Sequence, residues 1–273
     1  MPEKKSIDKL IKTVAKLRSQ NGCPWDKEQT HKTLKRYLIE ESYETIDAID
    51  SNDKHLLMEE LGDVLLQVVL HAQIARENKD FTFDDICNHI NKKMISRHPH
   101  VFSNTKVKNT EEVLKNWEIL KSNEKPYRKE LFDGIPNSLP ALLKALKVSK
   151  KVARVGFEWE RDSALWKKFY DEIKEFKQAI KSKDRSKQSE EFGDLLFTAV
   201  NLARWYKLDP EENLNNGTKK FITRFNKVVK MASNSKKGTN KLSPKELNTL
   251  WEKVKKEERK NRRINRVKKQ LHQ

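Results

Sequence analysis

The sequence carries one pattern of acidic residues twice, at a constant separation of 131 positions. In each copy two acids lie three positions apart, and a second pair with the same spacing starts nineteen positions after the first. The first copy comprises Glu41, Glu44, Glu60 and Asp63, and the second comprises Glu172, Glu175, Glu191 and Asp194. Residues three apart share one face of a helix. The repeat therefore constrains the chain to two similar helical modules, each with acids on paired helices.

The acidic pattern indicates a bound cation, because like charges at this spacing repel each other. Acids near a helix start are favoured by the helix dipole, which could explain Glu60 and Glu191 on its own. An exposed acidic face could likewise explain Glu41 or Glu172. The repetition of the whole pattern in register favours a metal site, and oxygen ligands suit hard ions such as Mg²⁺. We therefore expect a metal-dependent enzyme that acts on phosphates.

The periodicity of apolar residues predicts an all-α fold of tandem helical-bundle modules. Apolar and charged residues each make up 36% of the chain, with seven glycines and eight prolines, and no convincing alternating strand occurs. In the first half, helices are predicted from Ser6 to about 21 and over about 30–50, 53–77, 82–97 and 110–123. The helix over 53–77 has apolar residues nearly all round and is expected to be buried. Pro24 is expected to block the first helix, and His98-Pro99-His100 is expected to form a turn rather than a metal site.

The repeat also predicts the domain organisation. Pro126, Gly134, Pro136 and Pro140 mark a linker between the copies. We expect an N-terminal module over 1–125, a linker over 126–140 and a C-terminal module over 141–273, with a basic tail from about 256.

Composition sets limits on location and partners. No apolar run is long enough to span a membrane, and the N-terminus lacks the apolar core of a secretory signal; a cytoplasmic protein is expected. Cys23 and Cys87 form no metal or redox motif and are expected to be buried or half-buried. The net charge of +18, much of it between Lys253 and Lys269, leaves nucleic-acid binding open as an alternative. Scattered lysines elsewhere favour a solvated or phosphate-attracting surface.

Several motifs together resemble the MazG nucleoside triphosphate pyrophosphohydrolases over almost the whole chain. They are Gly22-Cys-Pro-Trp25-Asp26-Lys-Glu-Gln-Thr30, Glu40-Glu41-x-x-Glu44, Glu60-Leu-Gly-Asp63, Arg97-His-Pro-His-Val-Phe102, Val155-Gly-Phe157 and Glu191-Phe-Gly-Asp194-Leu-Leu-Phe197. The resemblance implies a homodimer and Mg²⁺-dependent hydrolysis of nucleoside triphosphates, including deoxynucleotides, to monophosphate and pyrophosphate, with Mn²⁺ as a possible substitute. It also implies that the C-terminal module carries the main activity.

The resemblance further implies roles for individual residues. Glu172, Glu175, Glu191 and Asp194 would be metal ligands, and Glu41, Glu44, Glu60 and Asp63 would be their counterparts in a module that is structural or weakly active. Nucleotide contacts would come from Lys168, Lys187, Lys220, Arg224, Trp251 and Lys255. Asp171 would also line this site, although the family more often has Glu there.

The expected chemistry is metal-assisted hydrolysis of a phosphoanhydride. A non-ligating acid, Asp171 or Glu190, could accept the proton of the attacking water, while lysines and arginines stabilise charge on phosphate oxygens. Two alternatives stay open at this point: a basic nucleic-acid-binding helical protein, and a non-catalytic nucleotide-sensing scaffold.

Overall fold

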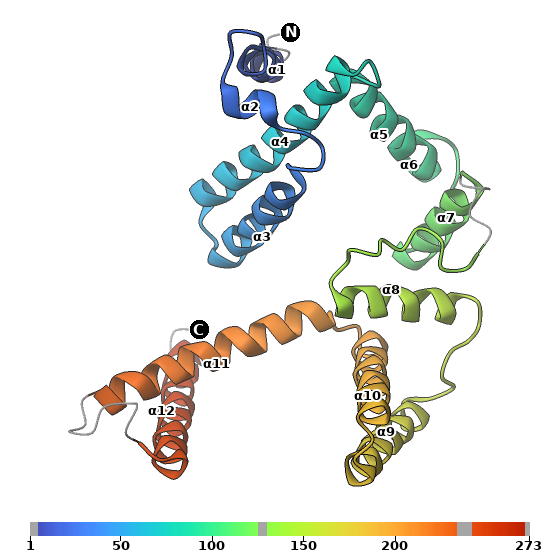
Figure 1. The fold of residues 1–273 in the computed structure, drawn as a ribbon. Coiled ribbons are helices and arrows are strands. Elements are labelled where there is room, and N and C mark those ends of the chain that lie inside the picture. The colour runs from blue at the N-terminus through green and yellow to red at the C-terminus, as the bar shows by residue number, and fades with distance from the viewer. Residues whose placement is uncertain (1–4, 125–129, 234–241, 271–273) are drawn as a thin grey trace. The chain divides into compact units, whose positions relative to one another are not determined.

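The computed structural model describes residues 5–124, 130–233 and 242–270, and every regular element in these ranges is a helix (Figure 1). The all-α prediction is thus confirmed. The chain divides into two units, residues 1–126 and 127–273. The expected module boundaries and linker stay predictions, and residues 125–129 of this region lie outside the described ranges. Among the described residues, no helix combines the length and apolar character that crossing a bilayer requires.

The first unit is built on a hairpin of two antiparallel helices, α3 and α4, with α1 packed on α4. Helix α5 follows α4 and contacts α7. The helices of this unit are α1 (Lys5–Leu17), α2 (Pro24–Glu28), α3 (Lys35–Ser51), α4 (Lys54–Glu77), α5 (Phe83–Arg97), α6 (Pro99–Phe102) and α7 (Thr110–Asn123).

The second unit has a corresponding hairpin, made of α9 and α10, with α8 packed on α10. Helices α11 and α12 pack on each other, and α11 also contacts α8 (Figure 1). The helices of this unit are α8 (Ala141–Arg154), α9 (Asp162–Ser182), α10 (Arg185–Trp205), α11 (Pro210–Ser233) and α12 (Pro244–Gln270). Two hairpins that each carry one copy of the acidic pattern agree with tandem helical modules.

The turns of the two hairpins have the same conformation. In the first, Asn52 adopts a left-handed φ of 57°, and the Asp53 carboxylate accepts hydrogen bonds from the first backbone amides of α4. In the second, Lys183 has φ of 59° and Asp184 caps α10 in the same way. Because an aspartate cap satisfies otherwise unpaired amides, this turn fixes where the second helix of each hairpin begins.

The core of the first unit lies between α1, the start of α3 and the C-terminal half of α4. Its fully or nearly fully buried members are Val14, Leu34, Val69, Leu70 and Ile74. The Leu34 position recurs 131 residues later as Leu165, and both side chains have no exposed surface. The two hairpins are therefore anchored at equivalent positions.

Helix α3 starts later than predicted, at Lys35 rather than about Thr30. The Thr30 and Thr33 hydroxyls accept hydrogen bonds from each other's backbone amides, at 3.2 and 2.9 Å. These side-chain bonds compete with helix formation. Pro24 ends no helix but starts α2, because a proline at the first helical position lacks only an amide that would be unpaired anyway.

Three further predictions were wrong in part. Helix α4 is buried only in its C-terminal half, since Met58 and Leu61 are exposed. His98-Pro99-His100 begins the short helix α6 instead of forming a plain turn. Cys87 is exposed, whereas Cys23 is half-buried as expected. Exposed apolar residues on α4 show that apolar content alone does not decide burial within one chain.

Candidate active site

The second unit brings three of its four predicted metal ligands together. Glu172 and Glu175 on α9 and Glu191 on α10 each offer a carboxylate oxygen, and these oxygens lie within 4.8 Å of one another. Glu172 is only 3% exposed. Asp194 lies one turn after Glu191 on α10 but offers no oxygen to this group. An oxygen-only set of this size, with one buried and two half-buried members, fits a hard divalent cation.

Lys168 lies beside the two members of this group that α9 carries, Glu172 and Glu175. Its Nζ is 2.7 Å from Oε1 of Glu172 and 3.9 Å from Oε2 of Glu175. The hydrogen bond to Glu172, followed by the charges of the surrounding acids, raises the pKa of Lys168 above its ordinary value. The lysine therefore stays charged and partly neutralises the cluster. An ammonium at this position can either offset the acids or turn towards a phosphate.

The remaining predicted residues of this hairpin lie around the acids. Asp171 is half-buried on α9, and its charge contributes to the raised pKa of Lys168. Glu190 and Lys187 are exposed on α10. Lys187 lies four residues before Glu191, a spacing that places both on one face of the helix. Proton-accepting and phosphate-binding groups are thus available beside the carboxylates.

The first unit has an equivalent acidic group without a lysine. Oxygens of Glu41, Glu60 and Asp63 come within 4.8 Å of one another. Glu44 is outside this group, but its charge still acts on both glutamates. Burial, followed by the neighbouring carboxylates, raises the pKa of Glu41 and the pKa of Glu60. Tyr37 occupies the position that corresponds to Lys168, and none of the ion pairs between described residues of this unit involves these acids.

Four predicted nucleotide contacts form a separate group on α11 and α12. Arg224 Nε lies 2.8 Å from Glu258, Lys255 lies 2.8 Å from Glu252, and the Trp251 ring centroid is 5.0 Å from that of Phe221. Lys220 is exposed on α11. None of the described contacts joins this group to the acids. Glu191 is fourteen residues before the end of α10, about 21 Å along the helix axis. Helix α11, which follows that end, packs mainly on α12 and α8 and not on α9, so the described packing keeps the two groups apart.

Glu258, which the sequence analysis did not single out, contacts one of the predicted nucleotide-binding residues, Arg224. Its carboxylate accepts hydrogen bonds from both Arg224 and Lys227, at 2.8 and 2.9 Å, and these bonds lower the pKa of Glu258. The sequence feature that could have pointed to Glu258 is its position as an acid within a strongly basic segment. This pairing orients Arg224 towards α12.

Comparison with known proteins identifies the family. The sequence profile of the MazG nucleotide pyrophosphohydrolase domain matches the chain twice, over residues 29–102 and 161–229. Each matched segment contains one acidic hairpin. The chain belongs to the MazG family. The resemblance inferred from the motifs is thereby confirmed, and so is the duplication of the MazG domain within one chain.

Two of the relatives match nearly end to end, and a third matches this chain over about half of its own length. The nucleoside triphosphate pyrophosphohydrolase/pyrophosphatase MazG of Thermotoga maritima is 44% identical over 91% of this chain and 95% of the relative. The nucleoside triphosphate pyrophosphohydrolase of Escherichia coli K12 is 41% identical over 92% and 98%. The uncharacterized protein YabN of Bacillus subtilis is 46% identical over 90% of this chain but only 51% of its own length.

Proposed function

We propose that the chain hydrolyses nucleoside triphosphates, ribose or deoxyribose, to nucleoside monophosphate and pyrophosphate at the acidic hairpin of α9 and α10. The observation that carries this proposal is the convergence of Glu172, Glu175 and Glu191, with the charged Lys168 bound to Glu172. The names of the T. maritima and E. coli relatives support the choice of reaction. Water would attack the α-phosphorus, the bond from this atom to the bridging oxygen would break, and pyrophosphate would leave.

Glu172, Glu175 and Glu191 would hold the divalent metal, with Asp194 as a fourth ligand from the next turn of α10. Bound Mg²⁺, or Mn²⁺ in its place, would lower the pKa of a coordinated water and neutralise charge on the leaving pyrophosphate. Glu41, Glu44, Glu60 and Asp63 would form a second metal set in the first unit. The raised pKa values of Glu41 and Glu60 fit a group whose charge a cation relieves.

The chain's own residues supply the remaining steps. Asp171 or Glu190 would accept the proton of the attacking water. Lys168 and Lys187 would bind phosphate oxygens, and this requires Lys168 to exchange its contact with Glu172 for one with the substrate. A lysine suits this exchange because its flexible stem carries a point charge that can redirect its hydrogen bonds.

We also propose that the active form is a homodimer. The acidic hairpin exposes large apolar side chains, each at least 37% exposed: Tyr170, Ile180, Phe192, Leu196 and Phe197. This number of exposed apolar side chains on one helix hairpin supports an interaction surface there. Because one chain keeps α11 and α12 apart from the acids, a second copy would have to bring Lys220, Arg224, Trp251 and Lys255 to the nucleotide. Sedimentation equilibrium tests this; a monomer at working concentration would contradict it.

Product analysis tests the proposed reaction. Incubation with ATP and Mg²⁺ should yield AMP and pyrophosphate, and Glu172→Gln should reduce turnover by at least about 100-fold. Glu257→Gln, an exposed acid on α12, is the matched control and should retain full activity. Formation of ADP and phosphate would contradict the proposed bond cleavage, and equal rates for both variants would contradict the proposed site.

A further inference from the structure

The first unit contains an open pocket of about 530 Å³ between α2 and the start of α3. Its lining combines two aromatic rings, Trp25 and Tyr37, with three cations, Lys32, Lys35 and Arg36. None of the lining residues is acidic. Cations beside aromatic faces form a suitable site for a ligand that has both a flat ring and anionic groups.

The aromatic part of the pocket offers a free ring surface. Trp25 is 50% exposed although it contacts Tyr37 edge to face, with ring centroids 5.9 Å apart. The Arg36 guanidinium lies over the Tyr37 ring, 4.5 Å from its centroid. The face of Tyr37 is thus partly covered by Arg36, and Trp25 has surface left on which a base could stack.

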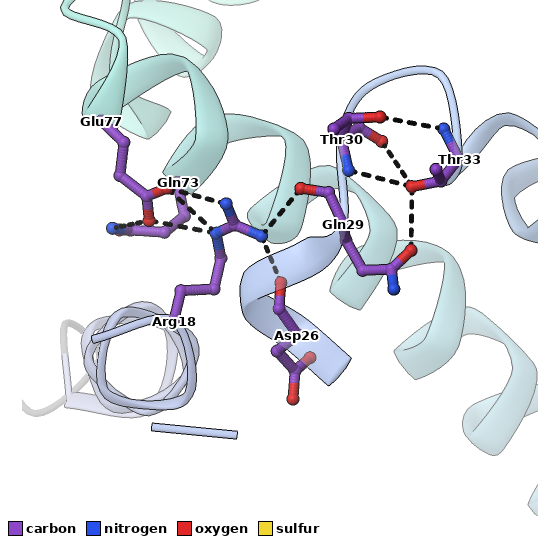
Figure 2. A network of polar contacts seen from close by, with 7 residues as sticks. All are labelled: Arg18, Asp26, Gln29, Thr30, Thr33, Gln73 and Glu77. Carbon is purple, nitrogen blue, oxygen red and sulfur yellow. Dashed lines mark hydrogen bonds and ion pairs between the residues drawn. The ribbon is translucent and has the colours of Figure 1, made fainter. Parts of the chain in front are cut away.

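Side-chain hydrogen bonds from Arg18, Gln29 and Thr33 hold the segment that carries the pocket (Figure 2). The Gln29 side chain, which is nearly buried, donates to the Trp25 carbonyl at 2.9 Å and accepts from the Thr33 hydroxyl at 2.8 Å. Arg18 donates to the backbone carbonyls of Gln29, at 3.1 Å, and of Asp26. A pocket fixed before binding loses little conformational entropy when the ligand arrives.

The pocket is only partly matched in the second unit, where Arg36 corresponds to Lys167 and Tyr37 to Lys168. At the corresponding positions, 131 residues on, Lys32 is replaced by Ser163 and Lys35 by Trp166. Tyr37 lies one helical turn before Glu41, about 6 Å along α3. A ligand in the pocket would therefore lie next to the acids of the first hairpin, on the same helix face.

We propose that this pocket binds a nucleotide, with its base stacked on Trp25 and its phosphates held by Lys32, Lys35 and Arg36. The site lies in the first unit and does not depend on turnover by the acids of α9 and α10. It gives the chain a second nucleotide site that differs from the proposed active site in its residues. Base stacking and phosphate contacts contribute separately, so they can be removed separately.

Calorimetric titration of the full chain tests the proposal. The Glu172→Gln/Glu191→Gln chain is used with EDTA, so that neither acidic group holds a metal, and α,β-methylene-ATP is the probe. Trp25→Ala and Lys32→Ala/Arg36→Ala should each weaken binding at least about tenfold, the usual scale for losing one stacked base or one to two charged hydrogen bonds. Trp25→Phe keeps a ring and should retain most of the affinity. Tripolyphosphate, which has no base, should respond to the double substitution and not to Trp25→Ala.

The control is Lys9→Ala/Lys12→Ala, which removes the same charge from exposed positions of α1 and should leave affinity unchanged. Unaltered thermal midpoints would show that the pocket variants fold. Absence of binding to the parent chain would overturn the proposal. So would equal affinity across all variants, or an effect of the double substitution without any effect of Trp25→Ala. Failure of the wild-type chain to form AMP and pyrophosphate would refute the proposed reaction alone.

Discussion

Arg18 connects three segments of the first unit, and its replacement by methionine should destabilise this unit by about 3 kcal/mol. The Arg18 side chain is 6% exposed and binds Glu77 on α4 with two nitrogens, at 3.0 and 2.8 Å. It also donates to the carbonyls of Asp26 and Gln29 (Figure 2). Methionine keeps the apolar stem but removes every one of these donors.

The size of the destabilisation by Arg18→Met follows from the Glu77 carboxylate, which is left without its partner. Removing one partner of a buried ion pair costs about 3–5 kcal/mol, and Glu77 is 36% exposed, which places this pair at the lower end because water screens it. Glu77→Gln should cost less, about 1 kcal/mol, because both carbonyl contacts of Arg18 survive. The difference in destabilisation between Arg18→Met and Glu77→Gln therefore measures how much the carbonyl contacts, which anchor the loop between α2 and α3, contribute beyond the ion pair.

Urea unfolding of the full chain at neutral pH gives the free energies, and hydrogen exchange of residues 18–34 locates the loss. Arg76→Met is the matched control, since Arg76 is the exposed neighbour of Glu77 on α4. The reasoning is refuted if Arg18→Met is no more destabilising than Arg76→Met, or if exchange within 18–34 is unchanged.

The pair of Arg18 and Glu77 also predicts how the folding stability depends on pH. The hydrogen bond from Arg18 lowers the pKa of Glu77 below its ordinary value of 4.5. A carboxyl with a lowered folded-state pKa stabilises the protein above 4.5, and this contribution disappears as the pH falls through the folded-state pKa. Wild type should therefore lose more stability than Arg18→Met on acidification below 4.5. Parallel acid titrations of the two chains would contradict the assigned cause.

Further predictions concern the two hairpins. Leu165→Ala should destabilise the second unit by about 2–5 kcal/mol in urea unfolding, because Leu165 is fully buried; a loss near zero would show that this position is not part of a core. Burial and the charge of Asp63 raise the pKa of Glu41. Ionisation of Glu41 therefore costs folding free energy as the pH rises above 4.5. Glu41→Gln should raise the thermal midpoint in EDTA at pH 7 but not at pH 4. Lys168→Met should strengthen Mg²⁺ binding to the nucleotide-free chain in calorimetry, because the ammonium near Glu172 competes with a cation; Lys174→Met, exposed on the same helix, is its control.

Local patterns sufficed to predict the hairpins and their acids. The separation of 131 residues places Glu60 and Glu191 at equivalent points, and the structure groups each with acids from the preceding helix. The second helix of the first hairpin was expected from about 53, and Asp53 caps α4. These features depend on helix periodicity and on side chains that bind nearby amides, which are both readable over a few residues.

Features that depend on contacts between distant positions were not predictable. One local feature was missed as well: the Thr30 and Thr33 hydroxyls bind each other's backbone amides and delay the start of α3, although the apolar periodicity continues through them. Residues that the resemblance assigns to one nucleotide site, such as Lys168 and Arg224, lie on different helix pairs within the chain. A motif records which residues occur together in a family, whereas the fold decides which of them one polypeptide can bring into contact.

The Arg–Glu pairs that secure the two hairpins should prevent the two halves from exchanging segments with each other. In the first unit the cation, Arg18, precedes the hairpin and the acid, Glu77, lies on it. In the second the order is reversed: Glu158 precedes the hairpin and Arg204 lies on α10, at the position of Gln73, a partner of Glu77. A chimera that joined the leading segment of one half to the hairpin of the other would oppose arginine to arginine, or glutamate to glutamate. Gene conversion between the duplicated halves would thus yield poorly folding proteins, which gives each copy room to diverge in what it recognises.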